Sequence, residues 1–154
     1  MQEQRKQTRQ NIKILNPKIC EFDCILNIEK ELRLPATSFK HFISLIKSKK
    51  IFVLKKLSSN KILGFVQIQG DKEESEIITL GVRTKFQNKG YGKKLINYLT
   101  KNNYKNIFLE VSSSNQKAIK FYMNLGFKNI SIRKKYYKSH INKDDALILN
   151  YKKV

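Results

Sequence analysis

The stretch FQNKGYGKKL at residues 86–95 places two glycines, Gly90 and Gly92, among lysines. It follows the apolar run IITLGV at 77–82 and opens a segment whose apolar residues have helical spacing. Backbone N–H groups at the start of a helix lack intrahelical partners, and the helix dipole adds partial positive charge there. The stretch therefore predicts an anion-binding loop. A tight strand-to-helix turn without any ligand is the alternative that the glycines leave open.

Two common phosphate-binding loops are excluded by single residues. A Walker A loop requires a glycine five positions before Gly92 and a Ser or Thr two positions after it, where this chain has Gln87 and Lys94. A Rossmann fingerprint requires a third glycine where Leu95 stands. The pattern that remains is Gln87-x-x-Gly90-x-Gly92.

Glu110 is isolated among cations. Between Ile77 and Lys143 the sequence holds 15 basic residues and no other carboxylate. Side chains alternate along a strand, so Glu110 shares a face with Phe108 at the end of the run NIFLEV. A carboxylate in such a place could accept a proton from a nearby amine as a general base. A solvated side chain paired with a neighbouring lysine is the alternative.

Other kinds of chemistry find less support. No Gly-x-Ser-x-Gly stretch occurs, and neither His41 nor His140 has a recognisable partner, so a serine nucleophile has no support. Cys20 and Cys24 lie four residues apart, and with two histidines they do not form the paired ligand sets of a structural zinc site. We expect two reduced thiols in the core, one helical turn apart, and no metal.

The spacing of apolar residues predicts the elements that must position these side chains. Strands are expected at residues 11–15, 50–57, 61–69, 77–82, 106–111, 127–137 and 145–153, and helices at 17–32, 39–47, 90–102 and 116–125. The acidic stretch 71–76 is expected to be a turn. This order, β-α-α-β-β-β-α-β-α-β-β, indicates an α/β (α+β) fold in which a mixed sheet carries helices on both faces.

Single residues predict where some of these helices begin and end. Asn16 is expected to cap the first helix with Pro17 at its first position, and Asn115 to cap the last one. Gly126 is expected to end the last helix, with Phe127 packing back on its final turn. The first helix is expected to present one apolar face, made of Ile19, Phe22, Cys24, Ile25 and Leu26.

Length and composition limit the remaining possibilities. At 154 residues the chain is expected to form one domain over residues 11–154 after a frayed polar tail at 1–10. No apolar run approaches the ~18 residues of a membrane span, and the N-terminus lacks a signal-peptide core, so we expect a cytoplasmic protein without membrane contact. The net charge of +20 rests on 27 Lys and 5 Arg, and Lys, Asn and Ile, which have A/T-rich codons, make 60 of the 154 residues. Because arginine is scarce, we expect no dedicated nucleic-acid binding.

Two stretches of the chain resemble the GNAT superfamily of acetyl-CoA-dependent N-acyltransferases. Residues 87–92 match its Arg/Gln-x-x-Gly-x-Gly/Ala loop, and LEVSSSNQKAIKFYMNLGF matches its second acyl-CoA motif at Asn115, Ala118, Tyr122, Gly126 and Phe127. The resemblance implies a GNAT-like, mostly antiparallel central sheet and acetyl-CoA as the co-substrate. It assigns the pantetheine arm to the backbone of Leu80, Gly81 and Val82, a cofactor hydrogen bond to Asn115, and the pyrophosphate to Gln87, Asn88, Lys89, Gly90, Tyr91, Gly92 and Lys93.

Within this superfamily, LEVSSSN and the tail RKKYYKSHINKDDALIL at 133–149 resemble the RimI-type ribosomal-protein alanine N-acetyltransferases. That resemblance implies acetyl transfer to the N-terminal α-amine of a protein, a ribosomal one, by direct attack in a ternary complex. It makes Glu110 the base and Tyr122 the acid that protonates the leaving thiolate. It also places Tyr136 and Tyr137 in the peptide groove, and it assigns the oxyanion to backbone N–H groups near Val82.

One departure from the RimI-type pattern concerns the acceptor. The segment at 34–37 carries Ala36 after Pro35, where those enzymes usually carry an aromatic residue. Two other functions stay open, namely acetylation of a small-molecule amine and a non-catalytic module that binds acyl-CoA or RNA. The basic charge argues against a cationic small amine because like charges repel, and Glu110 together with Tyr122 argues against a module without catalysis. An ordinary buried place on a helix face is the alternative for Tyr122.

Overall fold

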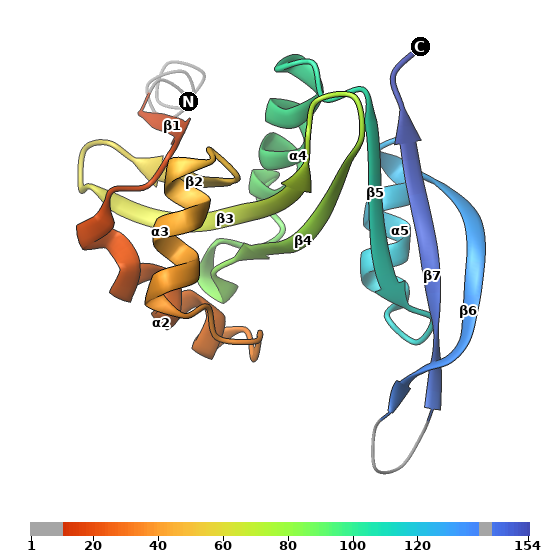
Figure 1. Cartoon of the computed structure of the whole chain (residues 1–154). Coiled ribbons are helices and arrows are strands. Elements are labelled where there is room, and N and C mark those ends of the chain that lie inside the picture. Colours follow the sequence, from red (N-terminus) through yellow and green to blue (C-terminus); the bar gives the residue numbers. More distant parts are fainter. Residues whose placement is uncertain (1–10, 139–142) are drawn as a thin grey trace. The chain divides into compact units, whose positions relative to one another are not determined.

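The structure is a computed structural model that describes residues 11–138 and 143–154, without the side chains of residues 135–138 and 143 (Figure 1). The predicted tail at 1–10 and residues 139–142, which include His140, lie outside the described residues. The helices are the 3-10 helices η1 (Ile19–Glu21) and η2 (Thr84–Phe86) and the α-helices α2 (Phe22–Glu31), α3 (Phe39–Lys47), α4 (Tyr91–Lys101) and α5 (Gln116–Asn124). The strands are β1 (Ile12–Leu15), β2 (Ile51–Lys56), β3 (Lys61–Gly70), β4 (Ser75–Val82), β5 (Asn106–Ser112), β6 (Lys128–Lys138) and β7 (Lys143–Lys152).

The predicted order of strands and α-helices is confirmed, and the two 3-10 helices are additions to it. The strands form a sheet in the order β1-β2-β3-β4-β5-β7-β6. The pairs β1–β2, β2–β3, β5–β7 and β6–β7 are antiparallel, whereas β4 and β5 are parallel. The fold is therefore of the predicted α/β (α+β) class, with a mixed and mostly antiparallel sheet.

The chain forms two compact units. The first ends at Ile68 and resumes for Thr79–Tyr98, and the second contains Gln69–Ile78 and Leu99–Val154. The single domain expected over residues 11–154 stays a prediction. No α-helix among the described residues is both long enough and apolar enough to cross a bilayer.

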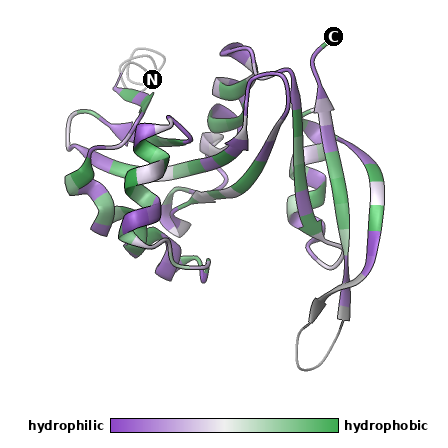
Figure 2. Ribbon diagram, viewed as in Figure 1, coloured by the Kyte–Doolittle hydropathy of each residue, from purple (hydrophilic) through white to green (hydrophobic). Residues whose placement is uncertain are grey.

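The core of the first unit lies between two helices and two strands. Eight buried apolar side chains of α2, α3, β2 and β3 form it: Ile25, Ile28, Phe42, Leu45, Ile51, Val53, Ile62 and Phe65. Apolar residues predominate among positions 62–68 of β3, all of which are buried, with Gly64 and Gln67 between them (Figure 2). Phe52 points to the other face of β2, because side chains alternate along a strand, and its ring lies 5.1 Å from that of Tyr98 of α4. Helices therefore cover both faces of this part of the sheet, as predicted.

The start of the first helix was predicted wrongly. Asn16 does not cap it, because its side-chain amide donates instead to the carbonyl of Ile51 at 3.1 Å. The chain turns through η1, where the Glu21 carboxylate accepts from the Lys18 N–H at 2.8 Å, and α2 begins at Phe22.

The prediction of buried thiols is also wrong. Cys20 and Cys24 are free and exposed, and the side chain of Ile19 is exposed as well. The buried stripe of α2 consists of Ile25, Ile28 and Glu29, and Cys24 lies off that stripe. A free Cys is often buried, but in this helix the isoleucines already fill the inward face.

Gly64 of β3 leads to a first prediction about stability. A Cβ at this position would lie 2.5 Å from the carbonyl oxygen of Gly81 and 3.1 Å from the Cα of Val82, both of them backbone atoms that no side-chain rotation can move away. We expect Gly64→Ala to lower the free energy of unfolding by about 2 kcal/mol and Tm by roughly 4–8 °C, measured by urea and thermal denaturation.

Gly90→Ala is the matched control for this change. A Cβ at Gly90 meets nothing within 4 Å, so its cost is the left-handed φ of 83° alone, about 1 kcal/mol. A loss for Gly64→Ala no larger than that of Gly90→Ala would contradict the packing argument.

The second unit holds β5, β6, β7 and α5. The end of α5 is as predicted: Gly126 has a φ of 92°, and the Phe127 N–H donates to the carbonyl of Tyr122 at 3.1 Å. The Phe127 ring lies 5.4 Å from the Tyr122 ring and 5.6 Å from the Tyr151 ring of β7, which fixes α5 on the sheet.

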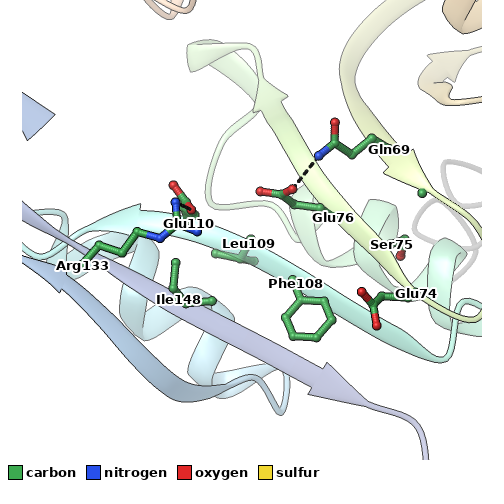
Figure 3. Close-up of a pocket in the computed structure, with 10 residues that line it drawn as sticks. Gln69, Glu74, Ser75, Glu76, Phe108, Leu109, Glu110, Arg133 and Ile148 are labelled. Atoms are coloured by element: carbon green, nitrogen blue, oxygen red, sulfur yellow. Dashed lines mark hydrogen bonds and ion pairs between the residues drawn. The ribbon is translucent and has the colours of Figure 1, made fainter. Parts of the chain in front are cut away.

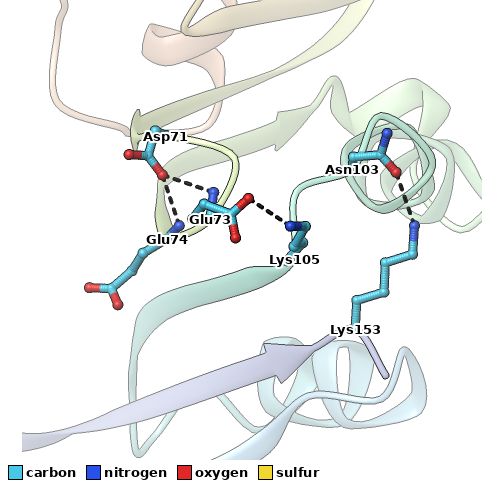
Figure 4. A network of polar contacts seen from close by, with 6 residues as sticks. All are labelled: Asp71, Glu73, Glu74, Asn103, Lys105 and Lys153. Carbon is cyan, nitrogen blue, oxygen red and sulfur yellow. Dashed lines mark hydrogen bonds and ion pairs between the residues drawn. The ribbon is translucent and has the colours of Figure 1, made fainter.

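The predicted turn at 71–76 is shorter than expected. The Asp71 carboxylate accepts from the N–H groups of Glu73 and Glu74 at 2.8 and 3.0 Å, and β4 begins at Ser75 (Figure 4). The Glu73 carboxylate pairs with the Lys105 ammonium at 2.7 Å. Glu76 is consequently a strand residue that lies beside Phe108 of β5.

Candidate active site

The glycine loop of the first unit forms at a strand-to-helix junction. After η2, Asn88 and Gly90 take left-handed φ values of 59° and 83°, and α4 begins at Tyr91. The Gln87 side-chain amide donates to the carbonyl of Val82 at 2.9 Å, which ties the loop to the end of β4. Glu31, at the end of α2, holds the other side of the loop, because its carboxylate accepts from the Thr84 N–H at 2.7 Å.

The backbone of this loop presents unpaired donors. Among the described residues, the N–H groups of residues 88–93 donate to no backbone or side-chain acceptor, and the first helical bond runs from the Lys94 N–H to the carbonyl of Gly90 at 3.1 Å. This is the usual state of a helix N-terminus, and it suits an anion. The ammonium groups of Lys89 and Lys94 lie 5.7 and 5.8 Å from the ring centres of Phe86 and Tyr91. The loop therefore fits a phosphate group in charge and in donor geometry.

The end of β4 has little room on one side. A Cβ at Gly81 would lie 2.9 Å from a methyl carbon of Leu32 and 3.3 Å from one of Leu34, so those side chains touch the backbone that was predicted to meet pantetheine. Buried Glu29, 2% exposed, fixes the segment that follows α2, because its carboxylate accepts from the Thr37 N–H at 2.9 Å and from the Thr37 hydroxyl. Sequence reasoning missed Glu29, although its position on the apolar stripe of α2 was a usable signal.

Glu110 of β5 lies in the second unit with Phe108, on the face that the alternation predicted. Its carboxylate is 2.8 Å from the guanidinium of Arg133 of β6, and the side chains are 22% and 56% exposed. The alternative reading of Glu110 was a solvated carboxylate paired with lysine. The structure gives it an arginine partner and partial burial.

A cavity of about 470 Å³ opens beside Glu110 (Figure 3). Apolar side chains, three carboxylates and one guanidinium line it together: Gln69, Gly70, Glu74, Ser75, Glu76, Phe108, Leu109, Glu110, Arg133 and Ile148. A concave surface with an apolar floor and a few charged groups is the usual form of a site for a small ligand or a short peptide segment.

Glu76 and Arg133 were missed as candidates. Glu76 had been assigned to the turn, and nothing in the spacing separates Arg133 from the other cations around it. Only the pairing of β5 with β7, and of β7 with β6, brings Arg133 to Glu110.

Tyr122 of α5 is 9% exposed, and its burial raises the pKa of its hydroxyl to about 12. No described residue hydrogen-bonds to that hydroxyl, and Tyr122 is not among the residues that line the cavity beside Glu110. Asn115 caps α5 as predicted, because its side-chain oxygen accepts from the Ala118 N–H at 3.1 Å. The buried place on a helix face, which was the alternative reading of Tyr122, is observed, and it does not exclude the acid role.

The tail residues are only partly described. Tyr136 and Tyr137 lie in β6, with Tyr137 opposite Asp144 of β7, and their side chains are outside the described part. The hydroxyls of Ser112 and Ser114 donate to the Asp144 carboxylate at 2.9 and 2.6 Å, and they hold its pKa below the usual value. Among the described side chains, no three of the His, Cys, Asp and Glu type lie close enough together to hold a metal ion.

A model of the acetyltransferase (GNAT) family matches residues 18–127, more than two thirds of the chain. The chain belongs to the acetyltransferase (GNAT) family. The [ribosomal protein bS18]-alanine N-acetyltransferase of Haemophilus influenzae is 28% identical over 135 residues, which cover 84% of this chain and 91% of that protein.

Solved structures agree with this membership. The ribosomal-protein-S18-alanine N-acetyltransferase from Escherichia coli superposes with a TM-score of 0.77 at 26% identity, over 92% of this chain and 93% of that one. Arabidopsis thaliana NAA60 in complex with a bisubstrate analogue shares the fold, with a TM-score of 0.78 at 19% identity over 92% and 97% of the two chains. The predicted resemblance is confirmed, and this GNAT protein is an acetyl-CoA-dependent N-acetyltransferase.

Proposed function

We propose that this enzyme transfers an acetyl group from acetyl-CoA to the N-terminal α-amine of a protein, a ribosomal one, in the cytoplasm. The proposal rests on the position of Glu110, whose half-buried carboxylate lines a cavity of about 470 Å³. The similarity to relatives named as ribosomal-protein alanine N-acetyltransferases supports the acceptor class.

The cofactor roles follow the loop geometry. The proposal assigns the pyrophosphate of acetyl-CoA to the loop of Gln87, Asn88, Lys89, Gly90, Tyr91, Gly92 and Lys93, with the α4 dipole and the nearby lysines adding positive charge. The donors are the N–H groups of residues 88–93, since the Gln87 N–H donates to the carbonyl of Thr84 at 3.3 Å and Gln87 holds the loop in place. The backbone of Leu80, Gly81 and Val82 takes the pantetheine arm and the reaction's oxyanion. In the second unit, Asn115 offers its side-chain NH2 group to the cofactor while its oxygen caps α5.

Glu110 acts as the base in this proposal. An α-ammonium has a pKa near 8, so roughly a tenth of it is neutral at pH 7. Glu110 takes one proton from the ammonium, directly or through a water, and the freed nitrogen lone pair attacks the thioester carbonyl carbon. The C–S bond then breaks and CoA leaves as a thiolate. The second proton of the nitrogen passes to water, which protonates the thiolate, and Glu110 releases its own proton to solvent before the next turnover. Arg133 orients the carboxylate through their 2.8 Å ion pair.

In this proposal the Tyr122 hydroxyl donates a hydrogen bond to the sulfur of the leaving thiolate. Its pKa of about 12 lies above the ~8.5 of an ordinary thiol, so complete proton transfer from phenol to thiolate is uphill by about 5 kcal/mol. The proposed role is therefore a strong hydrogen bond to the sulfur as charge develops there, followed by protonation from water. Tyr136 and Tyr137 are assigned to the peptide groove by resemblance.

A small-molecule amine is the second candidate acceptor. The net charge of +20 argued against a cationic amine, but the cavity beside Glu110 holds Glu74 and Glu76 as well and only one cation among its lining residues. Because nearby charges outweigh distant screened ones, the field in the cavity favours cations whatever the overall charge.

Mass spectrometry tests the proposal. The enzyme is incubated with acetyl-CoA and a peptide that begins with alanine and carries an internal lysine, and fragmentation locates the added acetyl group. We expect acetyl on the α-amine at a rate that depends on the first residues. Acetyl on lysine alone, or on spermidine in preference to any peptide, would contradict it.

A further inference from the structure

Two carboxylates of the cavity have no cationic partner. Glu110 is paired with Arg133, whereas Glu76 accepts a hydrogen bond of 2.6 Å from the neutral side-chain amide of Gln69 (Figure 3). The Glu74 side chain is exposed and pairs with no described residue. Among the described residues, neither carboxylate pairs with a lysine or arginine, and the one guanidinium that lines the cavity, that of Arg133, is paired with Glu110.

The floor between these carboxylates is apolar. Phe108 lies beside Glu76 in the register of β4 with β5, and Ile148 lies opposite Glu110 in the register of β5 with β7. The ring of Phe108 and the methyl groups of Ile148, both half-buried, offer a surface for a hydrocarbon chain, and an aromatic face also attracts a cation.

A cavity with an apolar floor and carboxylates at its edge is complementary to a long side chain that has an apolar stem and a positively charged end. Lysine and arginine lay their aliphatic stems on apolar surface and keep the charge at the tip. We propose that Glu76, with Glu74 beside it, binds a basic side chain near the N-terminus of the acceptor protein. This inference rests on the proposed function, since it treats Glu110 as the place where the α-amine is deprotonated.

Strand geometry sets which acceptor residue can reach this subsite. Glu110 is two residues beyond Phe108 and Glu76 is on the neighbouring strand, so their Cα atoms are about 8 Å apart by strand spacing. An extended acceptor advances about 3.4 Å per residue, and a lysine or arginine side chain spans a further 6–7 Å or so. The basic residue therefore belongs at the second or third position of the acceptor.

Two peptides that differ in a single charge test the proposal. Both begin with alanine, and one carries lysine at position two or three where the other carries norleucine, which keeps the stem and removes the ammonium. Binding is measured by calorimetry, without turnover, and KM and kcat are measured by acetylation. We expect the lysine peptide to have a Kd and a KM about fivefold lower in dilute salt, with the difference shrinking as salt is added.

Charge-neutralising variants identify the carboxylates. Glu76→Gln keeps the hydrogen bond with Gln69 and is expected to reduce the fivefold preference to less than twofold, and Glu74→Gln to reduce it in part. Glu73→Gln is the matched control, because Glu73 belongs to the same turn but pairs with Lys105 and does not line the cavity. It should leave the preference intact.

The proposed subsite and the proposed reaction can fail independently in these experiments. Equal Kd values for the two peptides, a preference that survives Glu76→Gln, or a change that falls on kcat rather than KM would overturn the subsite. If no peptide gained acetyl on its α-amine, the proposed function would fail, and the calorimetric comparison would still decide whether Glu76 selects a basic side chain.

Discussion

Glu110→Gln is expected to lower kcat/KM for peptide acetylation at pH 7 by roughly 10²–10³-fold, the usual contribution of a general base. Glutamine has the same shape and can still bond to Arg133, so the loss isolates the proton-accepting function. The Kd of acetyl-CoA, measured separately, should stay within about twofold.

The pH dependence of this loss is the sharper test. The α-amine of the peptide becomes mostly neutral on its own as pH rises through about 8. The defect of Glu110→Gln should therefore shrink by up to about tenfold between pH 7 and pH 9. Unchanged turnover at pH 7 would remove Glu110 as the base, and a loss constant with pH would assign it a purely structural part.

Tyr122→Phe is expected to lower kcat by roughly 10²-fold with little change in acetyl-CoA affinity, because the hydroxyl acts as charge reaches the sulfur in the transition state. The unfolding free energy should change by less than about 1 kcal/mol, since that hydroxyl bonds to no described residue and the ring contacts remain. Tyr151→Phe makes the same change in the same aromatic cluster and is expected to leave kcat unaltered.

The raised pKa of Tyr122 gives a second readout. Its value of about 12 lies above the ordinary 10, so the protonated hydroxyl persists across the assay range and the pH–rate profile should show no loss from phenol ionisation below pH 10. In the folding equilibrium, the stability linked to this shift is fully present below pH 10 and is lost as pH rises through 12. A kcat for Tyr122→Phe equal to that of Tyr151→Phe would contradict the donor role.

Local patterns were enough to predict most of the fold. The spacing of apolar residues predicts the strands and helices. The end of α5 can be predicted from Gly126 followed by the aromatic Phe127. Asn16 was misplaced because its real partner, the carbonyl of Ile51, is 35 residues away in the sequence. Cys24 was misplaced because apolar character does not reveal which side of a short helix faces the strands.

In the candidate site, too, local features could be predicted from the sequence and contacts between distant strands could not. Glu110 could be selected because no other carboxylate occurs near it in the sequence, which is a local fact. Its ion pair with Arg133 depends on β7 lying between β5 and β6, and Glu76 joins the cavity only through the parallel pairing of β4 with β5. Register between distant strands is set by the whole sheet, so no spacing within one segment encodes it.

The anchoring of the segment after α2 by Glu29 has an evolutionary consequence. Leu34 and Thr37 are tied to Glu29 through backbone N–H groups at 2.8 and 2.9 Å, while Pro35 and Ala36 between them are exposed. A chain held at both ends does not need its middle side chains for folding. We therefore expect these two positions to tolerate substitution at little cost in stability, so that an aromatic ring at position 36, as in the RimI-type pattern, and the alanine found there are compatible with the same fold.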